Sequence, residues 1–393
     1  MVEVNEALTG DGVEVPRGFV TYAGNAGIKD GTLDLSIIAS TIACVADGVF
    51  TKSLFAGPSV VLSRSNLESG APRAIVTVSK NANVATGPQG ERDAAALAEL
   101  VAAAIGSEPA DVLVGSTGVI GRRYPMERLR SHLRGLKMPK SADFAAVARA
   151  IMTTDAVPKL ASARAGEATV LGIAKGSGMI EPDMATLLGY VVTDAAVPKE
   201  AMSEAFRRTV DLTFNSLSID TDTSTSDSVL LLSNGAAGPV ETADFERALH
   251  AVCHSLTLQL AADGEGATKV VQVTVGTARD ASQAKRVAKA VVNSPLVKCA
   301  VHGADPNWGR VVMAIGKCSE DVDITPETVR VSFAGFEVYP SRLDDAGLGE
   351  LAKLMRSDMV EIDIDLGTGG AAATVWGCDL SAEYVHINAD YTT

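Results

Sequence analysis

One stretch near the middle of the chain combines residue types that could support nucleophilic catalysis. Residues 175–188 contain Gly176 and Gly178, then a proline, and then an Ala185–Thr186 bond. Glycine permits backbone conformations that are closed to other residues, and proline fixes its own φ. The segment that precedes Thr186 could therefore hold the Ala185–Thr186 peptide bond in a strained conformation beside the threonine hydroxyl. We predict that Thr186 cleaves the Ala185–Thr186 bond and becomes the first residue of a second fragment. Spacing alone also allows Thr186 to be an ordinary buried threonine that opens a helix or strand.

A free N-terminal threonine would carry both a nucleophile and its own base. An α-amino group has a pKa of about 7.7–8.0, against about 10.4 for lysine, so roughly a tenth of it is neutral at pH 7. The amine of Thr186 could therefore accept the hydroxyl proton without a histidine. No histidine lies in an obvious triad context, and we interpret all of them as surface or hydrogen-bonded core residues: His132, His250, His254, His302 and His386.

Attack on an amide carbonyl places negative charge on oxygen, which requires preorganised hydrogen-bond donors. The Ser-Thr-Gly-Val-Ile-Gly sequence at residues 116–121 is the candidate for these donors. A turn after a strand could aim the Gly118 N–H and the Thr117 hydroxyl at one point. The pattern of a phosphate-binding loop is absent, and the two central glycines lack the third glycine of a dinucleotide-binding fingerprint.

Charged residues near these segments could bind a substrate that carries both signs of charge. Lys175 could pair with a carboxylate, and Glu265, in a glycine-rich turn, could pair with an ammonium group. Either residue alone would normally be interpreted as a surface charge. Residues 218–227 alternate aspartates with hydroxyl residues but lack the glycine and the terminal glutamate of a calcium loop. We expect structural hydrogen bonding there and no metal.

Composition restricts the class of protein. The 393 residues carry a net charge of −14, which argues against nucleic-acid and anionic-membrane surfaces. The scattered cysteines form no C-x-x-C motif, so we expect reduced thiols in a cytoplasmic protein, with neither a zinc site nor a disulfide framework. Residues 1–17 lack the apolar core of a secretory signal, and no apolar run is long enough to predict a membrane span. The basic run at residues 122–134 is typical of a solvated helix face.

Hydrophobic periodicity predicts an α+β fold with layered sheets. Helices are expected at residues 91–105, 144–152, 199–214, 244–260, 281–292 and 348–355. Strands are expected at residues 18–22, 36–39, 74–79, 112–114, 168–174, 187–192, 229–232, 270–275, 360–366 and 371–376, with a hairpin at 329–338. We expect the last two strands to pair with each other across residues 367–370. No linker marks a domain boundary, so the division that we expect is chemical, into residues 1–185 and 186–393.

Several ordered segments, spanning nearly the whole chain, resemble motifs of the ornithine acetyltransferases, also called glutamate N-acetyltransferases. Residues 175–188 resemble the cleavage-site motif of that family. Further similarity lies at residues 81–87, 116–125, 151–155, 218–227, 263–269, 293–316 and 388–393. The resemblance implies a sandwich of two β-layers between α-layers, made of two fragments, 1–185 and 186–393, that stay together after cleavage. It also implies an oligomer with two or more copies of each fragment.

The same resemblance implies a two-step acyl transfer. Thr186 would take the acetyl group from N2-acetylornithine and pass it to glutamate, as in the acetyl-recycling step of arginine biosynthesis. The family pattern places the oxyanion hole on Thr117 and Gly118. It implies that the following residues bind substrate: Thr154, Lys175, Thr186, Glu265, Asn388 and Thr393. No cofactor is implied, although some members of the family also use acetyl-CoA as the acetyl donor.

One block departs from the family pattern. Lys80, Val84 and Ala85 stand where many relatives carry glycine, alanine and cysteine. Together with residues 301–303, this block looks more like members found in antibiotic gene clusters, such as that for clavulanic acid. The departure bears on the use of acetyl-CoA and on the pathway that the protein serves. Two alternatives stay open, namely an N-terminal-nucleophile amidase or aminopeptidase that hydrolyses the acyl-enzyme, and a non-enzymatic binding protein without processing.

Overall fold

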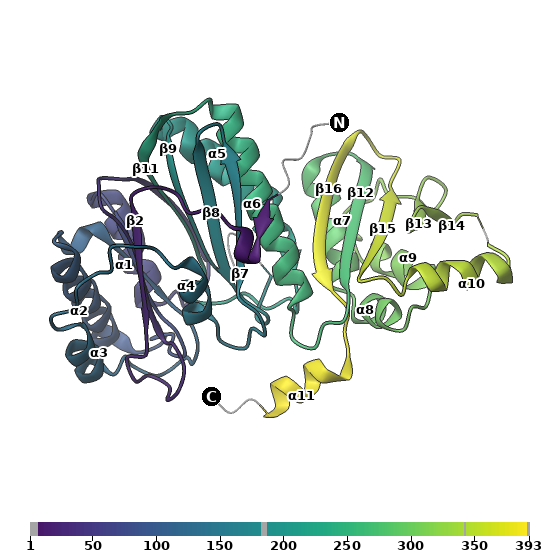
Figure 1. Ribbon diagram of the computed structural model, residues 1–393. Coiled ribbons are helices and arrows are strands. Elements are labelled where there is room, and N and C mark those ends of the chain that lie inside the picture. The colour runs from purple at the N-terminus through teal and green to yellow at the C-terminus, as the bar shows by residue number, and fades with distance from the viewer. Residues whose placement is uncertain (1–6, 182–186, 342, 391–393) are drawn as a thin grey trace.

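The computed structural model describes residues 7–181, 187–341 and 343–390, and two of its sheets stack face to face in the larger of two lobes (Figure 1). The first sheet has the order β1 (Leu8–Thr9), β7 (Lys159–Ala165), β8 (Ala168–Lys175), β9 (Leu188–Ala196), β11 (Ser228–Pro239) and β4 (Val45–Phe50). The second has the order β2 (Phe19–Gly24), β3 (Leu35–Ser40), β5 (Ala74–Val78) and β6 (Val112–Ser116). Short 3₁₀ turns lie at Gly10–Gly12, Pro109–Asp111 and Phe214–Ser216.

Helices cover both outer faces of this pair of sheets. Helices α5 (Lys199–Leu212) and α6 (Thr242–Ala262) pack on the first sheet, and α2 (Gly87–Ile105) and α3 (Met126–Leu133) pack on the second (Figure 1). Between the sheets, Leu113 and Leu171 belong to one buried core, to which α1 (Pro58–Ser69) and α4 (Phe144–Ile151) add Val60 and Phe144. The predicted α+β class and the layered αββα sandwich are therefore confirmed, and α2 ends at Gly106 in the left-handed conformation, with φ of 66°.

The smaller lobe contains the third sheet, which the sequence did not separate from the sandwich. Its order is β10 (Leu217–Ser218), β16 (Ala371–Cys378), β12 (Val270–Ala278), β15 (Met359–Asp365), β13 (Arg330–Phe333) and β14 (Phe336–Tyr339). Its helices are α7 (Ala281–Val292), α8 (Pro295–His302), α9 (Trp308–Gly316) and α10 (Asp345–Leu354). Apart from β10, the elements of this lobe follow α6 in the chain, and α11 (Ala382–Asp390) leads back beneath the sandwich (Figure 1).

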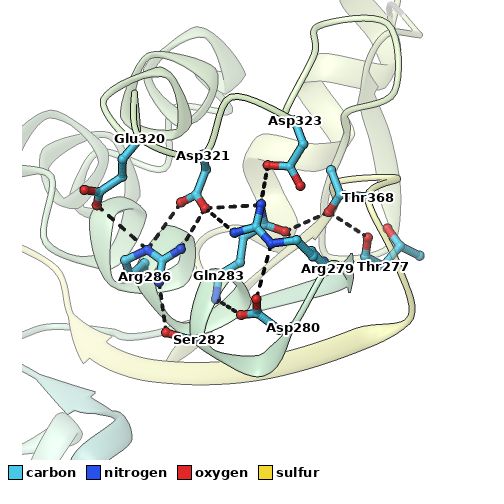
Figure 2. A network of polar contacts seen from close by, with 10 residues as sticks. All are labelled: Thr277, Arg279, Asp280, Ser282, Gln283, Arg286, Glu320, Asp321, Asp323 and Thr368. Atoms are coloured by element: carbon cyan, nitrogen blue, oxygen red, sulfur yellow. Dashed lines mark hydrogen bonds and ion pairs between the residues drawn. The ribbon is translucent and has the colours of Figure 1, made fainter.

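A polar network fastens the start of α7 to the segment that follows α9 (Figure 2). Its centre is Asp321, whose side chain is 1% exposed and accepts hydrogen bonds from Arg279 and Arg286 at 3.0 and 2.7 Å. Gln283 donates to the same carboxylate at 3.2 Å, and the hydroxyl of Thr368 donates to Gln283 at 2.7 Å. The network therefore joins segments that are far apart in the sequence.

The expected pairing of the last two strands is wrong. Strand β12 lies between β15 and β16, parallel to β15 and antiparallel to β16. The connection at residues 367–370 passes around the end of β12, where the N–H groups of Thr368 and Gly369 both donate to the Thr277 carbonyl at 2.8 Å. A Cβ at Gly369 would lie 2.5 Å from the Ala278 carbonyl oxygen, so this glycine permits a close backbone crossing and does not form a hairpin turn.

The structure confirms the predicted hairpin and the solvated basic helix, and it contains several elements that the sequence did not predict. The hairpin between β13 and β14 turns at Ala334 and Gly335, which both have positive φ, as a tight hairpin requires. The arginines of α3 face solvent, as expected for a solvated helix face. Sequence periodicity did not predict β7, α1, α8, α9 or α11. Among the helices of the described residues, none combines the length and apolar character needed to cross a bilayer.

Candidate active site

A cavity of about 200 Å³ brings together the predicted site residues that the structure describes. Its lining includes Thr117, Gly118, Thr154, Lys175, Glu265 and Asn388. These residues come from the turn after β6, the loop after α4, the end of β8, the turn after α6, and α11. Ala185, Thr186 and Thr393 lie outside the described residues. Leu187, which directly follows Thr186 in the sequence, also lines the cavity.

Gly118 is required by its surroundings as well as by its backbone conformation. Its φ is 122°, and a Cβ on it would lie 2.3 Å from the carbonyl carbon of Lys80 and 2.6 Å from the Asn81 nitrogen. Asn81 forms β-bridges to both Thr117 and Val119, so the segment around Lys80 and Asn81 packs directly against the Thr117–Gly118 turn. The Thr117–Gly118 turn is therefore held rigidly at the cavity wall.

Lys175 connects this turn to a buried carboxylate. Its Nζ donates to Thr117 Oγ1 at 3.3 Å and lies 4.0 Å from Asp155 Oδ2. Because the Thr117 oxygen accepts this hydrogen bond, its own hydrogen remains available as a donor. The side chain of Lys175 is only 10% exposed, which places its ammonium at the cavity and not on the open surface.

Asp155 is the buried centre of the charge arrangement behind the cavity. It accepts hydrogen bonds from Lys159 Nζ at 2.7 Å and from the Gly176 N–H at 2.6 Å, and Lys159 also contacts Asp263 at 2.5 Å. Burial alone would raise the pKa of Asp155, but Lys175, Lys159 and hydrogen bonds hold that pKa well below its usual range. Sequence reasoning missed Asp155 and Lys159, although Asp155 ends the block 151–155 that resembles the family.

The cavity lining also contains Glu265, the predicted ammonium partner. Glu265 accepts a hydrogen bond from Asn388 Nδ2 at 2.8 Å, and its backbone N–H donates to the Ser177 carbonyl at 2.8 Å. Thr154 and Ser177 share a hydroxyl hydrogen bond of 2.7 Å. A Cβ at Gly178 would lie 2.6 Å from the Glu265 carboxylate, so this glycine provides space. The unusual backbone conformation that was expected for both central glycines is found at Gly176, with φ of 149°, and not at Gly178.

Residues 218–227 form structural hydrogen bonds beside the site, as the sequence predicted. Asp220 accepts from the N–H groups of Met179 and Ile180 at 2.7 and 2.8 Å. Glu181 accepts from Asn293 at 2.7 Å, and its backbone N–H donates to the Asp222 carbonyl at 3.0 Å. Several hydrogen bonds therefore fix the chain directly before residue 182.

Asp227 is a cavity residue that sequence reasoning did not assign to the site. It is 3% exposed, and its Oδ2 has no hydrogen-bond partner among the residues that the structure describes. Burial holds the pKa of Asp227 well above its usual range, although Ser224 and the positive charge of Lys175 act in the opposite direction. Burial thus disfavours the charged form of Asp227 relative to that of an exposed aspartate.

The histidines that the structure describes are not among the lining residues of the cavity. His302 instead contacts Asp379 at 2.7 Å, and Thr268 donates to that same carboxylate at 2.5 Å. Within residues 7–181, 187–341 and 343–390, no group of His, Cys, Asp and Glu side chains could hold a metal ion.

Comparison with known proteins gives the family. The family model described as ArgJ matches residues 21–393. The arginine biosynthesis bifunctional protein ArgJ 2 of Nostoc sp. is 53% identical over 379 residues, which cover 96% of this chain and 98% of that protein. The glutamate N-acetyltransferase Oat2 of Streptomyces clavuligerus is 51% identical over 387 residues, with coverages of 97% and 98%.

A solved structure of ornithine acetyltransferase from Mycobacterium tuberculosis, in complex with ornithine, is 37% identical to the matched part of this chain. The match covers 44% of this chain and 94% of that one, with a TM-score of 0.40. The family model spans all the cavity residues described above, and the two relatives match nearly the whole length of the chain. They confirm the resemblance that the motifs predicted, and the chain belongs to the ArgJ family.

Proposed function

We propose that the protein transfers an acetyl group from N2-acetylornithine to glutamate through an acyl-threonine intermediate on Thr186. The observation that carries this proposal is the convergence of Thr117, Gly118, Lys175 and Glu265 on one cavity beside Leu187. Such a cavity offers oxyanion donors, a cation and an anion to a single small substrate. The glutamate N-acetyltransferase named among the relatives supports the same reaction.

In the first half-reaction, the α-amine of Thr186 takes the hydroxyl proton and Oγ attacks the acetyl carbonyl. The negative charge that develops on the carbonyl oxygen is stabilised by the Thr117 hydroxyl and the Gly118 N–H. Collapse of the tetrahedral intermediate breaks the C–N bond, and the Thr186 ammonium returns the proton to the leaving amine of ornithine. The products are free ornithine and an acetyl ester on Thr186.

In the second half-reaction, the neutral amine of glutamate attacks this ester. The same oxyanion donors act again, and the Thr186 oxygen regains its proton as N-acetylglutamate leaves. Lys175 pairs with the carboxylate that both substrates carry, and Glu265 pairs with the ammonium of ornithine. Acetyl-CoA could supply the acetyl group to the same nucleophile in place of acetylornithine.

The proposed cleavage between Ala185 and Thr186 falls between β8 and β9, which are neighbours in the first sheet. These strands pair in antiparallel register from Val170↔Thr193 to Lys175↔Leu188. A cut between them removes one covalent connection and leaves this ladder of hydrogen bonds in place. The two fragments, 1–185 and 186–393, therefore stay associated, and we propose that they assemble with at least one further pair.

Two measurements on the purified protein test the proposal. Mass spectrometry under denaturing conditions should give two fragments that meet at Thr186, and a Thr186→Ala variant should stay intact. Incubation with labelled acetylornithine and glutamate should give N-acetylglutamate in excess of free acetate. An active protein with an unbroken chain would refute the mechanism, and free acetate as the main product would instead indicate an amidase.

A further inference from the structure

Lys80 lies behind the oxyanion turn and has no role in the reaction as proposed above. Its backbone φ is 69°, a left-handed conformation that is uncommon for residues other than glycine. The carbonyl carbon of Lys80 is the atom that a Cβ at Gly118 would meet at 2.3 Å. Any shift of the Lys80 backbone is therefore transmitted directly to the Thr117–Gly118 turn, because close-packed atoms leave no room between them.

The side chain of Lys80 extends to the C-terminal end of α4. Its Nζ donates hydrogen bonds to Ser79 Oγ, at 3.2 Å, and to the carbonyl of Met152. Ser79 Oγ in turn donates to the Ala150 carbonyl at 2.6 Å. Met152 is the C-terminal cap of α4, where backbone carbonyls lack donors within the helix and the helix dipole favours a cation. The ammonium of Lys80 thus caps α4.

The residues directly after this cap belong to the site. Thr153 and Thr154 line the cavity, and the Thr153 N–H donates to Asp155 at 2.9 Å. We propose that Lys80 is a positioning residue for acetyl transfer, whose ammonium holds the oxyanion turn at a constant distance from the wall that carries Thr154. This inference rests on the proposed function.

Lys80 is half-buried, and the charged groups around it come from several elements. Burial and the positive charges of Lys175 and Lys29 lower the pKa of Lys80, and Asp155 and Asp34 act in the opposite direction, so that the resulting pKa is about 8. The ammonium therefore loses its proton in the folded enzyme as the pH rises through about 8. In the unfolded chain a lysine keeps its proton up to a pH of about 10.4.

This difference between the pKa of Lys80 in the folded and unfolded states distinguishes loss of positioning from unfolding. Between these two pH values the unfolded state binds the extra proton, so deprotonation of Lys80 stabilises the folded state as the pH rises. A fall in kcat above pH 8 that is caused by deprotonation of Lys80 would consequently not be the result of unfolding driven by the same titration. The α-amine of Thr186 must be neutral to act as a base, so its titration gives the acidic limb of the profile and not the alkaline one.

The test compares wild type with Lys80→Met and Lys80→Arg in steady-state acetyl transfer from acetylornithine to glutamate between pH 6 and 10. The methionine side chain is unbranched and only one heavy atom shorter than that of lysine, so it keeps the cost of positive φ but removes the charge. A displacement of catalytic groups on the order of 1 Å can cost about 100-fold, so Lys80→Met should lower kcat by roughly 10–100-fold with little change in KM. Its alkaline limb should disappear, and Lys80→Arg should retain kcat above pH 8.

Amide hydrogen exchange supplies a readout that does not depend on catalysis. Exchange at residues 117–119 and 150–154 should become faster in Lys80→Met and stay near wild type in Lys80→Arg. Wild-type kcat and an unchanged alkaline limb in Lys80→Met would overturn the inference, as would unchanged exchange in both segments. A wild-type protein without any acetyl transfer would refute the proposed function itself, and the positioning role of Lys80 in that reaction with it.

Discussion

Replacement of Gly118 by alanine tests whether the oxyanion turn works by being packed against its neighbour. The added Cβ would lie 2.3 Å from the Lys80 carbonyl carbon and 2.6 Å from the Asn81 nitrogen. Both are backbone atoms, so no side-chain rotation can relieve the contact. The φ of 122° adds a second cost, because L-residues with a side chain rarely adopt it.

The expected size of the effect follows from these two terms. A side chain in a sparsely populated backbone region costs about 1–3 kcal/mol, and overpacking costs about 1–3 kcal/mol more. If the turn stayed in place, the free energy of unfolding of the protein would therefore fall by about 2–6 kcal/mol. This is a large part of the roughly 5–15 kcal/mol that stabilises a typical domain. We expect the turn to shift away from Lys80 instead, which withdraws an oxyanion donor and lowers kcat by about 100- to 1,000-fold.

Gly121→Ala is the matched control for this experiment. Gly121 also has a positive φ, 83°, but a Cβ there would meet no atom within 4 Å. This variant carries the cost of backbone strain without the clash, so it should lose about 1 kcal/mol of stability and keep its kcat. Acetyl-transfer kinetics and urea unfolding should be measured on both variants. The reasoning fails if Gly118→Ala keeps the wild-type kcat, or if Gly121→Ala loses as much activity.

Three further variants test other parts of the structure. Lys159→Met removes the buried cation that contacts both Asp155 and Asp263. It should destabilise the protein by about 3–5 kcal/mol in urea unfolding, and a wild-type midpoint would contradict the buried ion pair. Glu265→Gln should raise KM for acetylornithine by roughly 10- to 100-fold, which corresponds to the loss of a charged hydrogen bond of about 1.5–3 kcal/mol. An equal rise in KM for glutamate would exclude a role for Glu265 that is specific to the ammonium of ornithine. Asp321→Ala breaks the network of Figure 2 and should lower the free energy of unfolding by about 1.5–3 kcal/mol at most, since the arginines are partly exposed. We expect kcat to be unchanged, because Asp321 is not among the residues that line the cavity.

The local features of this protein could be predicted from its sequence because local interactions produce them. Helix α2 follows from apolar residues at helical spacing and a glycine cap, and the β13–β14 hairpin follows from the residues at its turn. The ordered motifs were sufficient to identify the family and to select Thr117, Gly118, Lys175 and Glu265. Each of these predictions uses only the identity and spacing of residues that are close in the sequence.

Contacts between distant segments could not be predicted in this way. Nothing in the residues of β15 and β16 shows that β12 separates them, because each of these strands could pair with any other that has a suitable apolar face. The same limit applies to Asp155, which is buried between two lysines, and to Lys80, whose ammonium reaches the end of α4. Spacing and residue type determined which groups were available for chemistry. Only the tertiary structure decided which of them meet at one cavity, because burial and charge pairing depend on how distant parts of the chain pack together.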